Sequence, residues 1–174
     1  RPVMGRRLFF GESPNDDAVA VVIMPVRGGT EIAPATVTDP RCGPDIDMHA
    51  MARQVGTPLH ACSAPAIEAR IAELQCALRG LDALPCYAVK ANGSLAVLRL
   101  MAEAGLGADI VSGGELRRAL RAGIAPSRIV FSGVGKTADE IAQALDARIL
   151  RFNVESLDEL HTLQGVAAGL GVFM

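Results

Sequence analysis

The sequence contains few aromatic residues: its 174 residues include no Trp, one Tyr and five Phe. A densely packed core must therefore come mainly from Ala, Leu, Val and Ile. Half of the residues are hydrophobic and 21% are charged, a balance that is typical of globular domains rather than of disordered chains. At this length the chain fits one domain or a piece of a larger one.

The sequence also lacks an excess of charge and a long apolar run. Its formal net charge of −2 supplies no basic field to attract nucleic acid or anionic lipid, so neither nucleic acid nor a membrane is an expected partner. The apolar run at 18–26 is nine residues long, whereas a helix that spans a membrane needs about 20. Acidic residues separate this run from Arg6 and Arg7, so we expect no secretory signal and a cytoplasmic location.

Metal-binding spacings are absent from the sequence. No two cysteines form a C-x-x-C motif, and no histidine lies at ligand spacing from a cysteine, so we expect no metal site. We interpret the four cysteines as reduced, mostly buried thiols: Cys42, Cys62, Cys76 and Cys86. The three histidines are not expected to be catalytic: His49, His60 and His161.

The first part of the chain differs from the rest in composition and in hydrophobic pattern. Residues 1–45 are rich in Pro, Gly, Asp and Thr and show no sustained hydrophobic period, apart from one predicted strand within 18–26. We treat these residues as a poorly defined N-terminal extension and residues 46–174 as the N-terminal half of a larger domain. Its first predicted elements are a short helix at 47–55, a strand at 57–62 and a helix at 63–80.

From residue 84 onward, a unit of about 20 residues repeats, as is typical of β/α folds. The predicted strands are short apolar runs at 85–90, 108–112, 128–133 and 148–154. An amphipathic helix is predicted after each strand, at 94–104, 114–122, 137–147 and 156–170. Three of these helices begin with the capping-box pattern S/T-x-x-E: Ser112/Glu115, Thr137/Glu140 and Ser156/Glu159.

Apolar strands that each precede a helix indicate a parallel sheet covered by helices. The compact unit length favours a (β/α)8 barrel, which needs roughly 250 residues and eight units. We therefore predict an α/β fold, a partial (β/α)8 TIM-type barrel of about four β/α units with parallel strands. On this arithmetic the sequence stops where a fifth strand would begin.

Polar side chains follow the predicted strands, at the end of a barrel that carries function. Lys90, Asp109, Ser132 and Asn153 occupy equivalent positions in the repeat, so we expect them at one end of the sheet. Lys90 follows a largely apolar strand. A lysine with a desolvated stem is a candidate for forming a Schiff base, because burial favours the neutral, nucleophilic amine. In contrast, we interpret Lys136 as a solvated loop residue.

Several motifs together resemble the diaminopimelate decarboxylase family. They read CYAVKANGSLAVL, GADIVSGGELRRALRAGI, IVFSGVGKT and FNVES, in the family's order and spacing, and the resemblance runs from about residue 56 to 171. The family forms the decarboxylase branch of the pyridoxal 5'-phosphate (PLP) enzymes built like alanine racemase. The resemblance implies that Lys90 is catalytic and holds PLP covalently, and that Asp109 lies near the cofactor ring. It also implies residues that shape the site: Ser112, Glu115, Ser132 and Asn153.

The resemblance further implies a reaction, the PLP-dependent decarboxylation of meso-diaminopimelate to L-lysine in lysine biosynthesis. It implies a small amino-acid substrate and a homodimer in the full-length protein. In this family the remaining cofactor and substrate ligands lie on later strands and in a following β-domain. We therefore interpret the sequence as an incomplete copy, and we expect little or no turnover from these 174 residues alone.

Alternatives remain open at this stage. The residues that would discriminate a sibling PLP decarboxylase acting on arginine, ornithine or carboxynorspermidine would lie beyond Met174. A non-catalytic truncated fragment or a binding module is the alternative from another class. One departure from the family pattern is Ser94, which stands where relatives commonly carry a second Asn of the lysine motif. Because Ser and Asn are nearly equivalent as helix N-caps, we expect Ser94 to cap the helix that follows.

Overall fold

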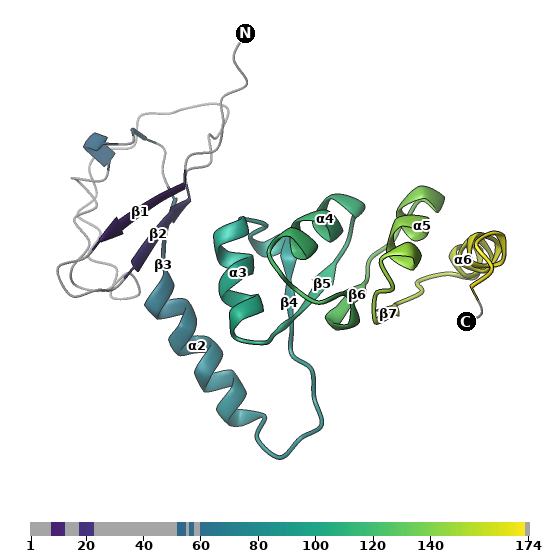
Figure 1. The fold of residues 1–174 in the computed structure, drawn as a ribbon, viewed down its shortest axis with the longest axis horizontal. Helices are drawn as coiled ribbons and strands as arrows, with labels where there is room; N and C mark the ends of the chain where they lie inside the picture. The colour runs from purple at the N-terminus through teal and green to yellow at the C-terminus, as the bar shows by residue number, and fades with distance from the viewer. Residues whose placement is uncertain (1–7, 13–17, 23–51, 55, 58–59, 173–174) are drawn as a thin grey trace, which may run out of the picture. The chain divides into compact units, whose positions relative to one another are not determined.

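The computed structural model describes residues 8–12, 18–22, 52–54, 56–57 and 60–172 (Figure 1). The chain divides into two compact units, residues 1–79 and residues 80–174. Most of the helix predicted at 47–55 lies outside the described residues, although 52–54 are helical. The predicted boundary near residue 45 lies outside them too, as do Cys42 and His49.

The first unit contains a small antiparallel sheet. Its strands are β1 (Leu8–Glu12), β2 (Ala18–Val22) and β3 (His60–Ser63), in the order β1-β2-β3, and both pairings are antiparallel. Helix α2 (Ala64–Ala77) follows directly. The sequence predicts β2 and β3 approximately but not β1, because the five residues LFFGE show no hydrophobic period that distinguishes a strand from a loop.

The second unit contains the predicted parallel sheet. Its strands are β4 (Cys86–Ala88), β5 (Gly107–Ile110), β6 (Ile129–Phe131) and β7 (Arg151–Phe152). They lie in chain order, and all three pairings are parallel. The strands are shorter than the predicted runs, because the apolar runs continue beyond the residues that pair. The four parallel strands confirm the prediction.

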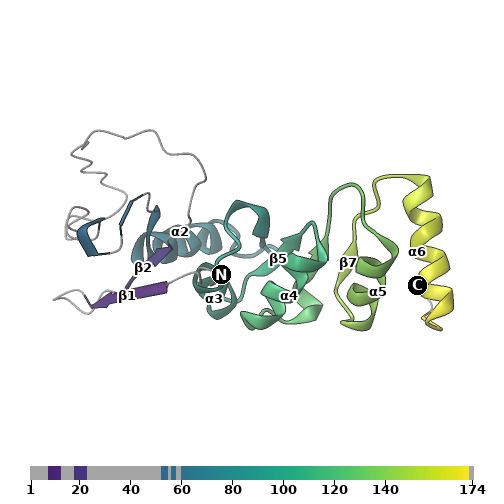
Figure 2. The ribbon, with the colours of Figure 1, turned by 90° about the horizontal axis from the view of Figure 1, so that it is seen from above.

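A helix follows each strand of this sheet: α3 (Leu95–Glu103), α4 (Gly113–Arg121), α5 (Ala138–Asp146) and α6 (Leu157–Gly169). Figures 1 and 2 show these helices following one another along the sheet in chain order. The sheet side chains that pack against the helices are fully buried, and they alternate along each strand: Ala108, Ile110, Ile129 and Phe131. Burial of each large apolar side chain contributes about 1.5–3 kcal/mol. The unit is therefore four β/α units of a (β/α)8 TIM-type barrel.

The three predicted capping boxes differ in the structure. Thr137 and Glu140 form the complete reciprocal box at α5. At α4 and α6 the serine accepts from the backbone N–H three residues on, but the glutamate is used elsewhere. The prediction of a box is therefore wrong at those two helices: the Glu115 carboxylate accepts from the nearby Val111 N–H, and the Glu159 carboxylate pairs with the distant Lys136 amine.

Ser94 is the N-cap residue of α3 by position, but its side chain makes no capping hydrogen bond. Instead, the Asn92 side-chain oxygen accepts a hydrogen bond of 3.0 Å from the backbone N–H of Ser94. The expectation that Ser94 caps the helix through its hydroxyl is thus wrong. The local Asn turn satisfies a backbone donor just before the helix instead.

Candidate cofactor site

The parallel register brings the predicted site residues to one end of the sheet. Asp109 pairs with Ala88, and Lys90 follows two residues later in a short 3-10 turn, Val89–Ala91. Ser132 and Asn153 directly follow the ends of β6 and β7. Because parallel strands point the same way, all four residues lie at the carboxyl ends, as predicted.

The register also assigns a row of residues to one face of the sheet. Ala88, Asp109, Val130 and Arg151 are paired neighbours across the four strands, so their side chains project to the same face. It is the face opposite the one that packs against the helices, since Ile110 and the other buried residues alternate with this row. In a barrel, this face is the interior.

Cys86 lies on the same face as Asp109, because it precedes Ala88 by two positions. Burial raises the pKa of the Cys86 thiol above its ordinary value of 9.0, and the negative charge of Asp109 raises the pKa further. Arg128 and Arg151 act in the opposite direction. The interior face at this point therefore carries a thiol, a carboxylate and guanidinium groups that influence one another.

The sequence contains two lysines, Lys90 and Lys136, and they differ sharply in their exposure to solvent. Lys90 is exposed. Within the described part of the chain, its amine has no hydrogen-bond or ion-pair partner. The described residues thus leave this amine open to a reactant.

Asp109 has a buried side-chain oxygen, Oδ1, that lacks a hydrogen-bond donor among the described residues. A buried carboxylate oxygen without a donor costs free energy, on the order of 1–3 kcal/mol, so such atoms in folded proteins usually have a partner. The position therefore calls for a hydrogen-bond donor.

The turn from β5 into α4 is held by the other acidic residue of the predicted site. The Glu115 carboxylate accepts a hydrogen bond of 2.7 Å from the backbone N–H of Val111, two residues after Asp109. The hydroxyl of Ser112 accepts from the backbone N–H of Glu115 at 3.2 Å. Together these bonds hold the backbone immediately after Asp109.

Ser132 and Asn153 come together directly. The Asn153 side-chain amide donates a hydrogen bond of 2.9 Å to the Ser132 hydroxyl oxygen, which joins the ends of β6 and β7. Their backbone N–H groups extend the sheet, because Ser132 donates to the Ile110 carbonyl and Asn153 to the Phe131 carbonyl. These two residues form one polar pair at the carboxyl end of the sheet.

Lys136 is not the solvated loop residue that the sequence suggested. Its side chain is 1% exposed and its amine lies 2.6 Å from the Glu159 carboxylate, whose own side chain is 8% exposed. The amine also donates to the carbonyl oxygens of Gly133 and Asn153. No local sequence pattern predicts this environment, because the residues that create it lie up to 23 positions away.

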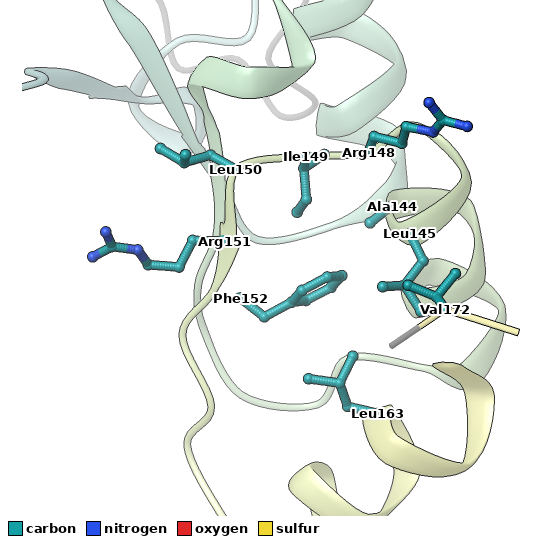
Figure 3. Close-up of a pocket in the computed structure, with 9 residues that line it drawn as sticks. All are labelled: Ala144, Leu145, Arg148, Ile149, Leu150, Arg151, Phe152, Leu163 and Val172. Atoms are coloured by element: carbon teal, nitrogen blue, oxygen red, sulfur yellow. The ribbon is translucent and has the colours of Figure 1, made fainter. Parts of the chain in front are cut away.

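A hollow of about 360 Å³ lies elsewhere, between α5, β7 and α6. Figure 3 shows the Phe152 ring pointing into it, with Ala144 and Leu163 on its walls, while Arg148 and Arg151 point away. Lys90 and Asp109 do not line it. The hollow is therefore a packing feature on the helix side of β7 and not part of the candidate cofactor site.

Two residues of the interior face escaped sequence analysis. Cys86 and Arg151 lie within predicted strands, away from the strand ends to which the barrel pattern assigns function. The signal that reveals them is the alternation of side chains along a strand once Asp109 is assigned to the interior. That signal becomes usable only when the register between strands is known.

The described residues were also compared with the requirements of a metal site and of a membrane-spanning helix. No group of three or more His, Cys, Asp or Glu side chains among them could hold a metal ion. None of the helices in that part of the chain combines the length and the apolar character needed to cross a membrane.

Comparisons with known proteins point in one direction. Residues 65–174 match the family described as pyridoxal-dependent decarboxylase, pyridoxal binding domain. The diaminopimelate decarboxylase of Pseudomonas aeruginosa is 51% identical over 122 residues, which cover 70% of this chain and 29% of that protein. The chain thus spans about three-tenths of the length of this curated relative.

Solved structures agree with the sequence match. The Helicobacter pylori diaminopimelate decarboxylase complexed with L-lysine is 51% identical, with a TM-score of 0.61, and the match covers 62% of this chain and 27% of that one. A viral arginine decarboxylase bound to agmatine, from Paramecium bursaria Chlorella virus, is 27% identical with a TM-score of 0.53. That match covers 59% of this chain and 27% of the viral one. The sequence likeness is therefore much stronger to the diaminopimelate enzyme.

Proposed function

The chain belongs to the pyridoxal-dependent decarboxylases, as part of their pyridoxal-binding domain, and we propose that it serves the decarboxylation of meso-diaminopimelate to L-lysine. One observation carries the proposal: Lys90 is an exposed amine without a partner in the described residues, at the functional end of a parallel sheet. The choice of substrate is supported by the relatives. Two that are named for diaminopimelate are 51% identical to this chain, and one that is named for arginine is 27% identical.

The residues at this end of the sheet fit PLP. Lys90 supplies a primary amine, the group that reacts with the aldehyde of the cofactor. Asp109 supplies a buried acceptor oxygen that has no donor among the described residues, so a protonated nitrogen or hydroxyl brought by a ligand would satisfy it. We assign covalent attachment of the cofactor to Lys90 and a hydrogen bond near the cofactor to Asp109.

When bound, PLP supplies an electron sink for the electrons released as carbon dioxide leaves the substrate. The residues of this chain supply binding and orientation. Lys90 holds the cofactor, and its amine must shed a proton before it can attack. Asp109 offers a negative charge at the same end of the sheet, while Glu115 keeps the backbone after Asp109 in place through the Val111 N–H. A rigid arrangement of charge is what such a site needs to stabilise a transition state.

We further propose a cytoplasmic location and a homodimeric full-length protein. The location is supported by Cys76 and Cys86, which are not disulfide-bonded, as expected for a reducing compartment. The dimer is supported by the family resemblance alone, which implies that a second subunit contributes residues to the substrate site.

Covalent capture of PLP by the purified chain tests the role of Lys90. PLP is added, the adduct is reduced with borohydride, and the modified peptide is identified by mass spectrometry. We expect the label on the peptide that contains Lys90, and its loss in Lys90→Ala. Lys136 provides an internal control, because its buried, ion-paired amine should stay unlabelled. Equal labelling of both lysines, or labelling that survives Lys90→Ala, would contradict the assignment.

The substrate is tested by carbon dioxide release from the complete gene product, with meso-diaminopimelate, ornithine, arginine and carboxynorspermidine compared at equal concentration. We expect release from meso-diaminopimelate, abolished by Lys90→Ala, and little or none from the 174-residue chain alone. Preferred turnover of ornithine, arginine or carboxynorspermidine would assign the protein to a sibling decarboxylase. If the complete product releases carbon dioxide from none of the four substrates, the non-catalytic alternative is favoured.

A further inference from the structure

The amine of Lys136 uses all of its hydrogen-bonding capacity inside the protein. It donates to the Gly133 carbonyl at 2.7 Å, to the Asn153 carbonyl at 2.8 Å and to the Glu159 carboxylate at 2.6 Å. A lysine ammonium has three N–H donors and no acceptor, so these bonds saturate it. The amine also lies 5.6 Å from the centre of the Phe131 ring, a favourable cation–π distance. This lysine is therefore fixed in one place.

The three acceptors come from different parts of the chain. Gly133 belongs to the loop at 132–136 that follows β6, and Asn153 begins the segment at 153–156 that follows β7. We call these two segments the mouth loops. The third acceptor, Glu159, lies in the first turn of α6. Lys136 consequently connects both mouth loops to the helix that follows the second of them.

Stability alone does not account for this arrangement. A buried ion pair gains little over well-packed apolar side chains, because removing two charges from water costs much of the attraction between them. Two of the three bonds, moreover, go to backbone carbonyls and are separate from the ion pair with Glu159. Those carbonyls belong to Gly133 and Asn153, next to the Ser132–Asn153 hydrogen bond at the carboxyl end of the sheet. The bonds of Lys136 thus converge on the polar pair of the candidate site.

We propose that Lys136 is a positioning residue, which holds the mouth loops so that Ser132 and Asn153 keep fixed places at the edge of the cofactor site. The part of this proposal that concerns PLP rests on the proposed function. The part that concerns the mouth loops rests only on the bonds of Lys136. Lys136 itself touches no cofactor in this role, and its effect passes through the two backbone carbonyls.

Three variants separate positioning from stability. Lys136→Met leaves the Glu159 carboxylate buried without its partner, and a lower thermal unfolding midpoint is expected. The double variant K136M/E159L removes both charges and should recover the midpoint, but it still lacks the donor to Gly133 and Asn153. Glu159→Gln is the matched control, because Lys136 keeps both carbonyl bonds and the glutamine oxygen still accepts.

Hydrogen exchange of two backbone amides reads out the mouth loops without any cofactor. The amides of Ser132 and Asn153 donate to the Ile110 and Phe131 carbonyls, so they report whether the loop beginnings stay attached to the sheet. We expect exchange at both to accelerate about tenfold or more in the double variant, the effect of losing bonds to a charged donor. In Glu159→Gln it should stay close to the parent rate. Parent-like exchange in a double variant with a recovered midpoint would overturn the proposal.

Circular dichroism of captured PLP tests the cofactor part, because a ring held in one orientation gives an induced signal and a freely rotating ring does not. The double variant should carry the same amount of PLP on Lys90 with most of the induced signal lost. An undiminished signal would overturn the link to the cofactor site. If the parent chain captures no PLP, the proposed function fails together with that link, while the exchange rates still decide whether Lys136 holds the mouth loops.

Discussion

The carboxylate of Glu140 accepts a hydrogen bond of 2.9 Å from the backbone N–H of Gly113, 27 residues away in sequence. Glu140 lies in the first turn of α5 and Gly113 begins α4, so one side chain serves the N-termini of two neighbouring helices. The same carboxylate accepts from the backbone N–H of Thr137 at 3.1 Å. Negative charge at helix N-termini is favourable, which suits this shared position.

We predict that Glu140→Gln lowers the free energy of unfolding at neutral pH by about 0.5–1 kcal/mol, a modest loss because the residue is only partly buried. Urea unfolding measures it. Asp139→Asn is the control, since it removes a charge from the same turn but Asp139 makes no hydrogen bond to α4 among the described residues. A loss for Asp139→Asn as large as that for Glu140→Gln would show that general charge, and not the bond to Gly113, is responsible.

The contribution of Glu140 should also depend on pH. Hydrogen bonds from the Gly113 and Thr137 backbone hold the pKa of Glu140 below its ordinary value of 4.5. A carboxyl with a lowered pKa stabilises the folded state above the unfolded value, and this stabilisation is lost as the pH falls through the folded value. The difference between the parent and Glu140→Gln should therefore shrink steadily as the pH is lowered below 4.5. A difference that is constant across this range would contradict the assignment.

Alkylation of Cys86 tests the charges on the interior face. Iodoacetamide reacts with the thiolate, so the rate follows the pKa of the thiol. Since Asp109 raises the pKa of Cys86 and Arg151 lowers it, Asp109→Asn should speed alkylation severalfold and Arg151→Gln should slow it. Rates at about pH 8 are measured by mass spectrometry of the Cys86 peptide. The exposed Cys76 serves as the internal control and should react at the same rate in all three proteins.

The alkylation rates of Cys86 test the register of the strands, and this test does not require bound PLP. Opposite effects of the two substitutions would place Asp109 and Arg151 on the face that carries the thiol. No effect of either would show that the register of β4, β5 and β7 is different from the one described. Because the folded-state pKa of Cys86 is raised, the stability it contributes is present below 9.0 and is lost as the pH rises through the raised value.

Two Gly→Ala substitutions should have opposite signs. A Cβ at Gly107 would lie 2.4 Å from the Arg128 carbonyl oxygen, a backbone atom that cannot move aside, so Gly107→Ala should destabilise the protein by roughly 3 kcal/mol or more. A Cβ at Gly165, within α6, would meet nothing within 4 Å. Gly165→Ala should therefore stabilise by about 0.5–1 kcal/mol, through helix propensity. Thermal unfolding of both proteins provides the measurement, and similar shifts in one direction would refute the packing at Gly107.

Glu115 can be probed in the same manner. Glu115→Ala removes the acceptor for the Val111 N–H and should cost about 1–2 kcal/mol, whereas Glu115→Gln keeps an acceptor oxygen and should cost less than half as much. Unfolding experiments compare the two variants. If the backbone after Asp109 matters for the cofactor, Glu115→Ala should also slow PLP capture at Lys90 relative to Glu115→Gln. Equal stability of the two variants would mean that the carboxylate charge, and not the hydrogen bond, is important.

Much of the second unit could be predicted from the sequence, because its elements follow local rules. The helices α4 and α5 were predicted within about one residue at their starts, since Ser112 and Thr137 are good N-caps before amphipathic runs. The parallel sheet followed from apolar strands that alternate with helices. The strands were predicted too long, because the apolar runs continue beyond the paired segments, which are as short as Cys86–Ala88 and Arg151–Phe152.

Prediction failed where the outcome depends on a distant partner. Glu159 satisfies the capping-box pattern, yet its carboxylate binds the Lys136 amine, 23 residues away. Lys136 is flanked by glycine and threonine, a setting that suggests solvent, but Phe131 and Glu159 enclose its amine. An ion pair across 23 residues leaves no periodic trace in a single sequence, so no local rule could find it.

The sequence by itself determined the repeat of strand and helix, the positions of the helix starts and the motif around Lys90, because each depends on residues within a turn or two. Only the tertiary structure decided which side chains share the interior face with Asp109 and that Lys136 is buried. Both depend on how strands align with one another. A shift of one residue in a strand would move every side chain to the other face, and local sequence does not specify that alignment.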